Sequence, residues 1–356
     1  MLSSEIRQKF LDFFEKRGHT VVPSSSLVPE GDTSVLFTTA GMQQFKPYYI
    51  DKANAQKDFG ALNTVSIQKC VRTSDIDEVG DESHLTFFEM LGNFSFGGYF
   101  KKDAIEYAHK FITEVMGLEI SYVTVFKGLE NGLIQKDTKS KEIWKSLGVK
   151  DIKEESLEDV FWGPTGNEGP CGPTTEIYVK NSEGKDIEIW NIVFNEFYCY
   201  GSHEQLLNAP STITIKDLPF KGIDTGMGLE RLAMVSQGVP TVFDTDLFQL
   251  TMDIFNKSMP VWSKRIISDH ARAAIFMIAD GVRPGNKEQD YVLRRIIRRA
   301  ISHLNEHQFF ELIEPGQDIS IDKRLSDVAI VLLNQYSQIS QYGYLLKKKK
   351  EILGVI

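Results

Sequence analysis

The spacing of apolar residues predicts helices and strands before residue 240, and almost only helices after it. Between residues 4 and 17, apolar side chains recur every three or four positions, which predicts an amphipathic helix. Its apolar face carries Ile6, Phe10, Phe13 and Phe14. Segments 64–72 and 84–96 are instead rich in β-branched and aromatic residues, as strands are. Because an acidic loop separates these two segments, we predict an antiparallel pair joined by a long hairpin.

Elements of both kinds continue to about residue 240. Further predicted helices lie at 101–116, at 137–147 and from about Leu229, and further strands at 174–180 and 186–200. Beyond residue 240 the predicted helices are 244–258, 264–281, 288–307 and 322–353. Mixed elements followed by helices alone indicate an α+β domain at 1–240 and an all-helical domain at 241–356.

Composition places the chain among ordinary globular proteins, with 42% hydrophobic and 25% charged residues in 356 positions. Its three cysteines are widely spaced and odd in number, so they predict neither a disulfide framework nor a zinc site. The acidic residues of the N-terminal segment are unlike a signal or transit peptide, and no apolar run approaches a membrane span. We therefore expect a cytoplasmic protein with no zinc and no membrane contact.

Charge is distributed unevenly along the chain. The formal net charge is −9, yet residues 264–299 hold nine Lys and Arg against four Asp and Glu, four of the arginines within RRIIRR at 294–299. A basic segment on an acidic protein suits local contact with phosphates. A solvated helix face would have the same composition, so the charge alone leaves both interpretations open.

The segment GIDTGMGLERLA at 222–233 combines an acid, glycines and an arginine at the start of a predicted helix. Glycines at a helix start allow the backbone to pass close to a phosphate. The segment is not a P-loop, because no Lys-Ser or Lys-Thr follows, and it lacks the third glycine of a dinucleotide-binding fingerprint. By itself it also fits a glycine-rich helix start with no ligand.

The predicted hairpin offers groups that suit a nucleotide. Arg72 ends its first strand, while Phe87 and Glu89 share one face of the second and Phe88 and Met90 the other. An arginine opposite an aromatic residue can hold a phosphate while the ring stacks on a base. The phenylalanines could equally be core residues.

Several segments together resemble the alanyl-tRNA synthetases, a family of class II aminoacyl-tRNA synthetases. In order, they are EIRQKFLDFFEKRGH, LFTTAGMQQFK, QKCVR, FFEMLGNFSFGGYF, GPCGPTTEI, EIWNIVF, DTGMGLER and DGVRPGNKEQDYVLRRIIRRA. The resemblance covers about residues 4–305. It implies an α+β catalytic domain with an antiparallel sheet flanked by helices, followed by a helical domain that recognises the tRNA acceptor stem.

The resemblance also implies an ATP-dependent ligase that converts alanine to alanyl-adenylate and passes it to the 3′ end of tRNA(Ala). It makes Arg72 and Arg231 catalytic, with Arg72 at the α-phosphate and Arg231 at the adenine and the pyrophosphate end. A fixed guanidinium there would stabilise the charge that develops during the displacement. Asp224 would pair with the ammonium group of alanine.

Further site residues follow from the same resemblance. Besides the two arginines, those implied for ATP are His84, Phe87, Glu89, Trp162, Ile189, Trp190, Asn191 and Gly228. Those implied for alanine are Trp162, Asn191, Val193, Asp224 and Gly226. Glu188 would hold Mg²⁺, although an ideal strand puts Glu188 and Asn191 on opposite faces and a β-bulge would be needed to bring them together.

The sequence departs from the family pattern in the loop between the hairpin strands. TSDIDEVGDES is shorter than usual and acidic, and the family's Arg-His-His-Thr reads Ser83-His84-Leu85-Thr86. One basic group and one histidine are absent, so ATP or acceptor-stem contacts normally made by this loop must be weaker or come from elsewhere.

The helical region suits tRNA. Asn286 falls where the family reads the G·U pair of the acceptor stem, and an amide can bond the minor-groove edge of an RNA helix. The arginines expected to contact RNA are Arg294, Arg295, Arg298 and Arg299, although some could instead form internal ion pairs with Asp269 or Asp280.

Longer members of the family carry a zinc-dependent editing domain and a C-terminal oligomerisation module. Neither is expected here, so the sequence fits either a catalytic fragment or a minimal enzyme, expected to be monomeric. A synthetase-like RNA-binding or regulatory protein that no longer catalyses is the alternative. Such proteins usually lose the phosphate arginines or the amino-group carboxylate, whereas Arg72, Arg231 and Asp224 are all present.

Overall fold

A computed structural model describes residues 1–31, 35–129, 132–164, 166–208, 212–306 and 321–356. Within these residues nine strands form one sheet, in the order β1-β2-β3-β9-β8-β7-β4-β5 with β6 paired to β7. The strands are β1 (Thr20–Val21), β2 (Asn63–Val71), β3 (Phe87–Phe96), β4 (Ile120–Phe126), β5 (Ile152–Glu155), β6 (Phe161–Trp162), β7 (Gly169–Lys180), β8 (Asp186–Tyr200) and β9 (Thr214–Gly228). Neighbours pair antiparallel except for β1 with β2 and β4 with β5, which are parallel.

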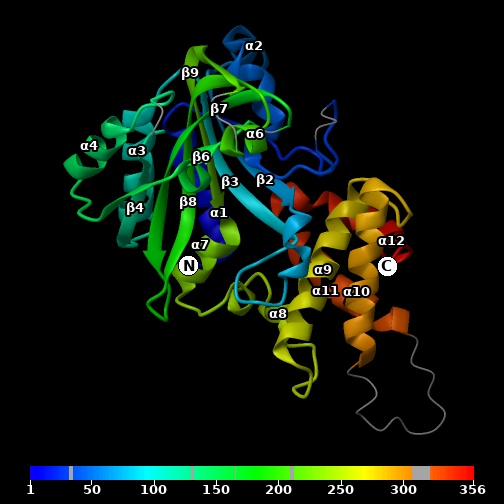
Figure 1. Cartoon of the computed structure of the whole chain (residues 1–356). Helices are drawn as coiled ribbons and strands as arrows, with labels where there is room; N and C mark the ends of the chain where they lie inside the picture. Colours follow the sequence, from blue (N-terminus) through cyan, green and yellow to red (C-terminus); the bar gives the residue numbers. More distant parts are fainter. Residues whose placement is uncertain (32–34, 130–131, 165, 209–211, 307–320) are drawn as a thin grey trace, which may run out of the picture.

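Helices flank the sheet and then continue alone. Those of the first part are α1 (Ser3–Glu15), α2 (Lys52–Phe59), α3 (Lys101–Lys110), α4 (Thr138–Ser146), α5 (Leu157–Val160), α6 (His203–Asn208) and α7 (Leu229–Gln237). Those of the second part are α8 (Gln249–Met252), α9 (Val261–Ala279), α10 (Glu288–Glu306), α11 (Ile321–Tyr336) and α12 (Tyr344–Leu353). Figure 1 shows α9 to α12 gathered beside β2 and β3, while α3 and α4 lie at the opposite side of the sheet.

The predicted hairpin is confirmed. Strands β2 and β3 pair antiparallel from Asn63↔Ser95 to Val71↔Phe87, and the acidic loop connects them. Strand β3 then pairs with β9, which ends at Gly228 where α7 begins. Arg72 and Arg231 are thereby brought to the same end of β2 and β9, the two strands that flank β3, although they are 159 positions apart in sequence. The α+β fold class is confirmed as well.

Two predicted helices are interrupted. Segment 244–258 begins at the end of a short 3₁₀ turn, Val242–Asp244, and contains only α8 as a helix, with the Thr245 hydroxyl donating to the carbonyl of Val242 at 2.6 Å. Threonine and aspartate side chains compete in this way with helical backbone bonds. Segment 322–353 divides into α11 and α12 around a turn that ends at Gly343, a residue that disfavours a helix interior.

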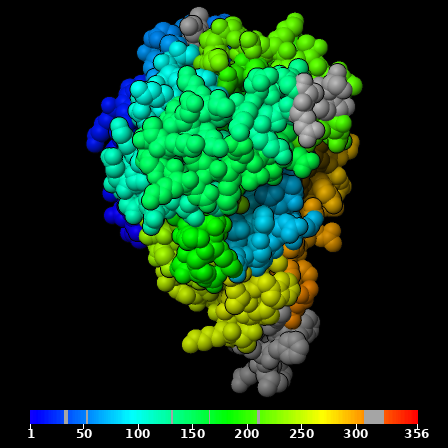
Figure 2. Space-filling model, turned by 60° about the vertical axis from the view of Figure 1, so that its left-hand side comes forward, coloured from blue at the N-terminus to red at the C-terminus, as the bar shows by residue number. Residues whose placement is uncertain are grey.

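One hydrophobic core extends from the sheet into the helices of the second part. The ring of Phe87 in β3 stacks on Phe276 in α9, with centroids 4.3 Å apart and planes 4° apart. On the same side of the sheet, Trp190 in β8 packs edge-on against Phe10 and Phe14 of α1. The helical region is therefore packed directly against the sheet. Figure 2 shows the loop that follows β2 in a hollow between the sheet region and the helices.

Candidate active site

A cavity of about 850 Å³ lies over the face of β3, β9 and β8 that the core does not cover. Most residues predicted for the site line it, namely Arg72, His84, Trp162, Glu188, Ile189, Asn191, Val193, Asp224, Gly226, Gly228 and Arg231. This volume is in the range of small-molecule sites, and the lining combines cations, carboxylates and apolar groups as such sites do.

Two arginines give the cavity its positive charge. Arg72 is exposed, lies 5.0 Å from the ring centroid of Phe88, and donates from Nε to the carbonyl of Thr39 at 3.4 Å. Arg231 is in the first turn of α7, and its Nη1 is 3.3 Å from Glu188 Oε2 and 3.3 Å from the Glu188 carbonyl. Neither guanidinium is fully engaged, so both have N–H groups for an anionic ligand.

A buried carboxyl group gives the cavity its negative charge. Asp224 in β9 is 5% exposed and, within the described residues, has no hydrogen-bond or ion-pair partner. Burial alone raises its pKa to about 8. A cationic ligand beside it would lower that pKa again, so Asp224 is suited to hold an ammonium group.

A β-bulge brings Glu188 and Asn191 to the same face. Trp190 pairs with Ile177, but Tyr178 pairs with Glu188, so Ile189 is an extra residue in β8. The bulge that the sequence required is therefore present, and Glu188, Ile189 and Asn191 all line the cavity. Val193 lies opposite Asp224 in the β8–β9 register and lines it too.

The two glycines of β9 have different surroundings. A Cβ atom on Gly226 would come within 2.9 Å of Met90 Sδ, because the Met90 side chain occupies the space above that backbone. A Cβ on Gly228 would meet nothing closer than 3.9 Å. Gly226 therefore accommodates Met90, and Gly228 borders open cavity space.

Three residues predicted to contact ATP lie outside this cavity. Phe87, Glu89 and Trp190 are each at most 1% exposed, lie on the opposite face of the sheet and do not line the cavity. Phe87 and Trp190 are core residues, as described above. On β3 the cavity is lined instead by Phe88 and Met90, the face that the prediction did not choose.

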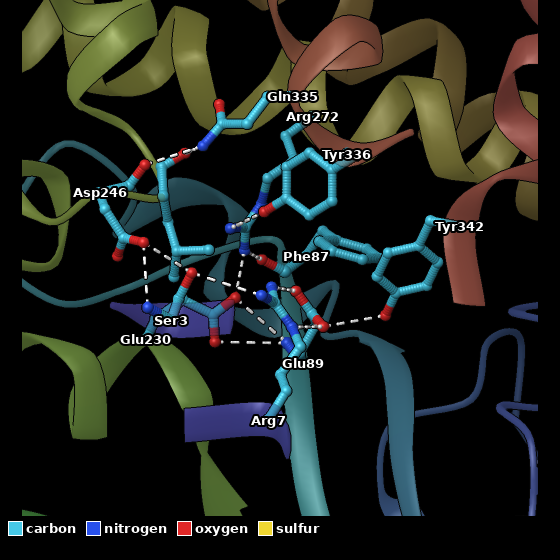
Figure 3. Close-up of polar contacts among 11 residues, drawn as sticks. Ser3, Arg7, Phe87, Glu89, Glu230, Asp246, Arg272, Gln335, Tyr336 and Tyr342 are labelled. Carbon is cyan, nitrogen blue, oxygen red and sulfur yellow. Dashed lines mark hydrogen bonds and ion pairs between the residues drawn. The ribbon is translucent and has the colours of Figure 1, made fainter. Parts of the chain in front are cut away.

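Glu89 belongs to a buried ionic network behind the sheet (Figure 3). Its Oε2 accepts from Arg7 Nε at 2.8 Å and from Tyr342 Oη at 3.0 Å. Next to it, Arg272 of α9 donates from Nη2 to Glu230 Oε1 at 2.6 Å and to the carbonyl of Phe87 at 2.5 Å. This network, which we call the rear network, ties α1, β3 and α7 to the helical region.

Glu176 and His203 line the cavity but were not identified from the sequence. Glu176 in β7 is 8% exposed, and burial together with the charge of Glu188 raises its pKa to about 7. His203 Nδ1 is 2.9 Å from the carbonyl of Gly163. The only sequence signal for Glu176 was its place in the strand-like segment TTEIYVK, which does not tell which face meets the cavity.

His84 lines the cavity from the acidic loop, where its Nδ1 is 2.5 Å from Asp81 Oδ2. Trp162 lines it from β6. Ser74 and Asp75, which follow Arg72 in the same loop, also border the cavity. The shortened loop thus closes one wall of the site.

The arginines of α10 differ in what they contact. Arg295 pairs with Asp77 at 2.6 Å, and Arg299 donates to the carbonyls of Ile76 and Val79, so both hold the acidic loop. Arg294 bonds Asn286, and both are on the molecular surface. Arg298 is exposed, with no ion pair or hydrogen bond in the described part of the chain.

In the part of the chain that the structure describes, none of these arginines forms an ion pair with Asp269 or Asp280, the alternative that the sequence left open. Asp280 pairs with Lys69 at 2.7 Å, and Asp269 with the ring of His270 at 2.9 Å. Lys69 of β2 thus holds Asp280 across the contact between the sheet and α9. Arg299 reaches instead the Nε2 of His270, at 3.0 Å.

Searches for metal-site and membrane signatures were limited to the residues that the structure describes. There, no three or more His, Cys, Asp or Glu side chains form a group that could hold a metal ion. No helix there has the length and apolar character needed to cross a bilayer.

The model of the family "tRNA synthetases class II (A)" matches residues 5–315, and the chain therefore belongs to this family. Among curated relatives, alanine–tRNA ligase of Rubrobacter xylanophilus is 45% identical over 334 residues, which are 84% of this chain and 36% of that protein. The enzyme of the same name from Borrelia hermsii is 43% identical, over 85% of this chain and 54% of the relative. The alanine–tRNA ligase of Borreliella afzelii is 41% identical, over 90% of this chain and 57% of the relative. The chain thus spans between about a third and somewhat more than half of these relatives.

Proposed function

We propose that this chain is the part of an alanine–tRNA ligase that activates alanine with ATP and charges the tRNA. The observation that carries the proposal is that one cavity contains three groups, namely two incompletely bonded arginines and a buried carboxyl group that has no partner among the described residues. A polyphosphate and an amino acid need this combination. The relatives named alanine–tRNA ligase support the choice of amino acid.

In the proposed first step, a carboxylate oxygen of alanine attacks the α-phosphorus of ATP and pyrophosphate leaves. Arg72 would stabilise the negative charge that increases on the non-bridging oxygens. Arg231 would hold the adenine and the pyrophosphate end, and Asp224 the ammonium group. The Phe88 ring, 5.0 Å from the Arg72 guanidinium, would keep that guanidinium in place. In the second step, a ribose hydroxyl of the tRNA attacks the carbonyl carbon and AMP leaves.

Mg²⁺ fits the acidic wall of the cavity. Glu188 is about a third exposed, and its charge is close enough to raise the pKa of Glu176, so a divalent cation would relieve their repulsion. Glu188 would hold the ion, which would supply neutralisation of phosphate charge. The residues around it supply binding and orientation.

The helical region, residues 241–356, is proposed to bind the tRNA acceptor stem, and residues 1–240 to carry catalysis. Asn286 and Arg294 form a polar pair on the surface of that region, and exposed Arg298, which has no partner among the described residues, could contact a phosphate. The Asn286→Ala variant should lose preference for a G·U over a G·C acceptor stem in charging assays. An unchanged ratio would remove Asn286 from base-pair recognition.

The proposal also includes a cytoplasmic location and a monomeric state. Three free, buried cysteines support a reducing compartment. Light scattering at working concentration tests the oligomeric state, and a stable dimer would contradict it.

The deciding experiment is alanine-dependent exchange of labelled pyrophosphate into ATP, because it requires adenylate formation but no tRNA. Exchange with alanine, and little with other amino acids, is expected. The rival, a synthetase-like RNA-binding or regulatory protein, would bind tRNA but show no exchange.

A further inference from the structure

The side chain of Asn191 is held in one orientation by its neighbour across the strand pair. Glu176 in β7 lies opposite Asn191 in β8, and Asn191 Nδ2 donates to Glu176 Oε1 at 3.4 Å. The other carboxylate oxygen, Oε2, accepts from Tyr178 Oη at 2.9 Å and from Thr124 Oγ1 at 3.2 Å. In its ionised form Glu176 has only acceptors, so in that form the amide nitrogen of Asn191 is the atom that faces it.

The opposite end of the amide is therefore the oxygen. Asn191 Oδ1 is buried and has no hydrogen-bond partner within the described residues, while Asn191 lines the cavity. Val193, two residues further on the same face of β8, lies directly opposite Asp224. An amide oxygen and a carboxyl group, neither with a partner among the described residues, thus belong to two residues that line one cavity. A buried acceptor without a donor is costly, and it indicates a ligand that brings the donor.

We infer that Glu176 is a positioning residue, which fixes the Asn191 amide so that Oδ1 accepts a hydrogen bond from the ammonium group of the amino-acid substrate. The inference rests on the proposed function, since it takes the substrate to be an α-amino acid. An ammonium group has three N–H donors and can bond Oδ1 and Asp224 together. If the amide turned over, its own N–H groups would face the ammonium and repel it.

The Glu176→Gln variant should force that reversal. The side-chain oxygen of the introduced glutamine can accept hydrogen bonds from the Tyr178 and Thr124 hydroxyls. Its amide nitrogen then faces Asn191, so the Asn191 amide must turn its Oδ1 toward that nitrogen. In pyrophosphate exchange, the KM for alanine should rise about tenfold or more, the effect of losing a hydrogen bond to a charged group. The KM for ATP should stay within about twofold. Tyr178→Phe is the matched control, since it removes a donor from Oε2 only, and it should change both constants little.

Loss of the negative charge at Glu176 could by itself weaken ammonium binding, so the same substitution is repeated in an Asn191→Asp background. Aspartate has an oxygen on both sides and no orientation to lose. Glu176→Gln should there leave the KM for alanine unchanged or lower it. An equal rise in both backgrounds would overturn the positioning role, as would an equal rise for alanine and ATP.

Two failures can be told apart. If the unmodified chain shows no alanine-dependent exchange, the proposed function fails. If it does exchange, and Glu176→Gln has the same KM for alanine as the unmodified chain, only the role of Glu176 fails. A partly unfolded variant would lower the maximal rate without moving either KM, and its thermal melting curve identifies that case.

Discussion

On the rear face of β3, Glu89 is bonded to Arg7 and Tyr342, and Arg272 to Glu230, with all four charged side chains almost completely buried. On the cavity face of the neighbouring strands, the same kinds of group lack partners. Asp224 has no partner among the described residues, and neither does Asn191 Oδ1. The two faces are separated by one layer of backbone.

The difference distinguishes structural charges from functional ones. A buried ion that is paired with a counter-ion is held by the fold, and removing one partner leaves the other uncompensated. A buried polar group left without a partner lowers the stability of the fold. Such groups are therefore typical of sites where a ligand supplies the missing partner. Charge type and burial alone would not separate Glu89 from Asp224, but the number of partners does.

The rear network gives the largest predicted effect. Glu89→Gln should lower the free energy of unfolding by about 3–5 kcal/mol, because Arg7 would keep its buried charge without a counter-ion. Urea denaturation measures this loss. Asp224→Asn is the matched control on the cavity face and should not destabilise the fold. Equal losses in the two variants would contradict the comparison.

The second-largest effect is expected for Arg72→Ala, which should lower the rate of pyrophosphate exchange and leave the stability of the fold unchanged. Removing a guanidinium that acts on the transition state is expected to cost about 2.7–4 kcal/mol of barrier, a fall of roughly 10²–10³ in exchange rate. The melting temperature should not change, since Arg72 is exposed and makes one 3.4 Å hydrogen bond. Arg17→Ala, at a surface away from the cavity, provides the comparison. Near-normal exchange by folded Arg72→Ala would remove Arg72 from the mechanism.

Asp224→Asn should raise the alanine concentration needed for half-maximal exchange by the equivalent of at least about 2 kcal/mol, as for loss of one member of a buried charge pair. An unchanged alanine requirement would show that another carboxylate holds the ammonium group. Titration of the exchange rate against alanine, at saturating ATP, measures it.

The same residue predicts a pH dependence of stability. With a pKa of about 8 when folded and near 3.8 when unfolded, Asp224 keeps its proton longer in the folded state. Its contribution to stability is therefore largest below about pH 4 and is lost as the pH rises through 8. Unfolding free energies of the unmodified chain should fall more steeply between pH 5 and 8 than those of Asp224→Asn. Parallel curves would exclude this shift.

The smallest effect concerns RNA. Arg298→Ala should weaken tRNA binding modestly and for all sequences, and should reduce the salt slope by about one, since it removes one phosphate contact. Pyrophosphate exchange should be unaffected. Arg299→Ala should instead impair exchange, because it releases the loop that follows Arg72. If the two variants behave alike in both assays, the division between them is wrong.

Sequence patterns predicted the strand pairing well, because alternation and an acidic turn are local signals. They also showed that a bulge was needed to bring Glu188 and Asn191 together, and one is present at Ile189. Which face of β3 meets the cavity was not a local property. Phe276, almost 190 positions away, covers the Phe87 face and leaves Phe88 on the other.

Other failures have similar causes. Glu176 had no sequence signal beyond its place in a strand-like segment, because its role depends on its partner Asn191 in β8. The register in which two separate strands pair cannot be predicted from either strand alone. The arginines of α10 looked equivalent in sequence. Their helical phase and the position of the acidic loop separate them, so Arg299 turns inward while Arg298 remains exposed.

The rear network also bears on how such a chain can change over generations. Arg272 and Phe276 come from the helical region, yet they satisfy Glu230 and cover Phe87 in the sheet. A chain cut after residue 240 would keep Glu89 and Glu230 as adjacent buried carboxylates and expose an aromatic surface to water. Sheet and helices should thus melt in a single cooperative transition. Recombination between the two parts would separate Arg272 from Glu230, its buried counter-ion in the sheet region. The two parts form one heritable unit, in which the helices of the second part belong to the frame that keeps the strands of the cavity folded.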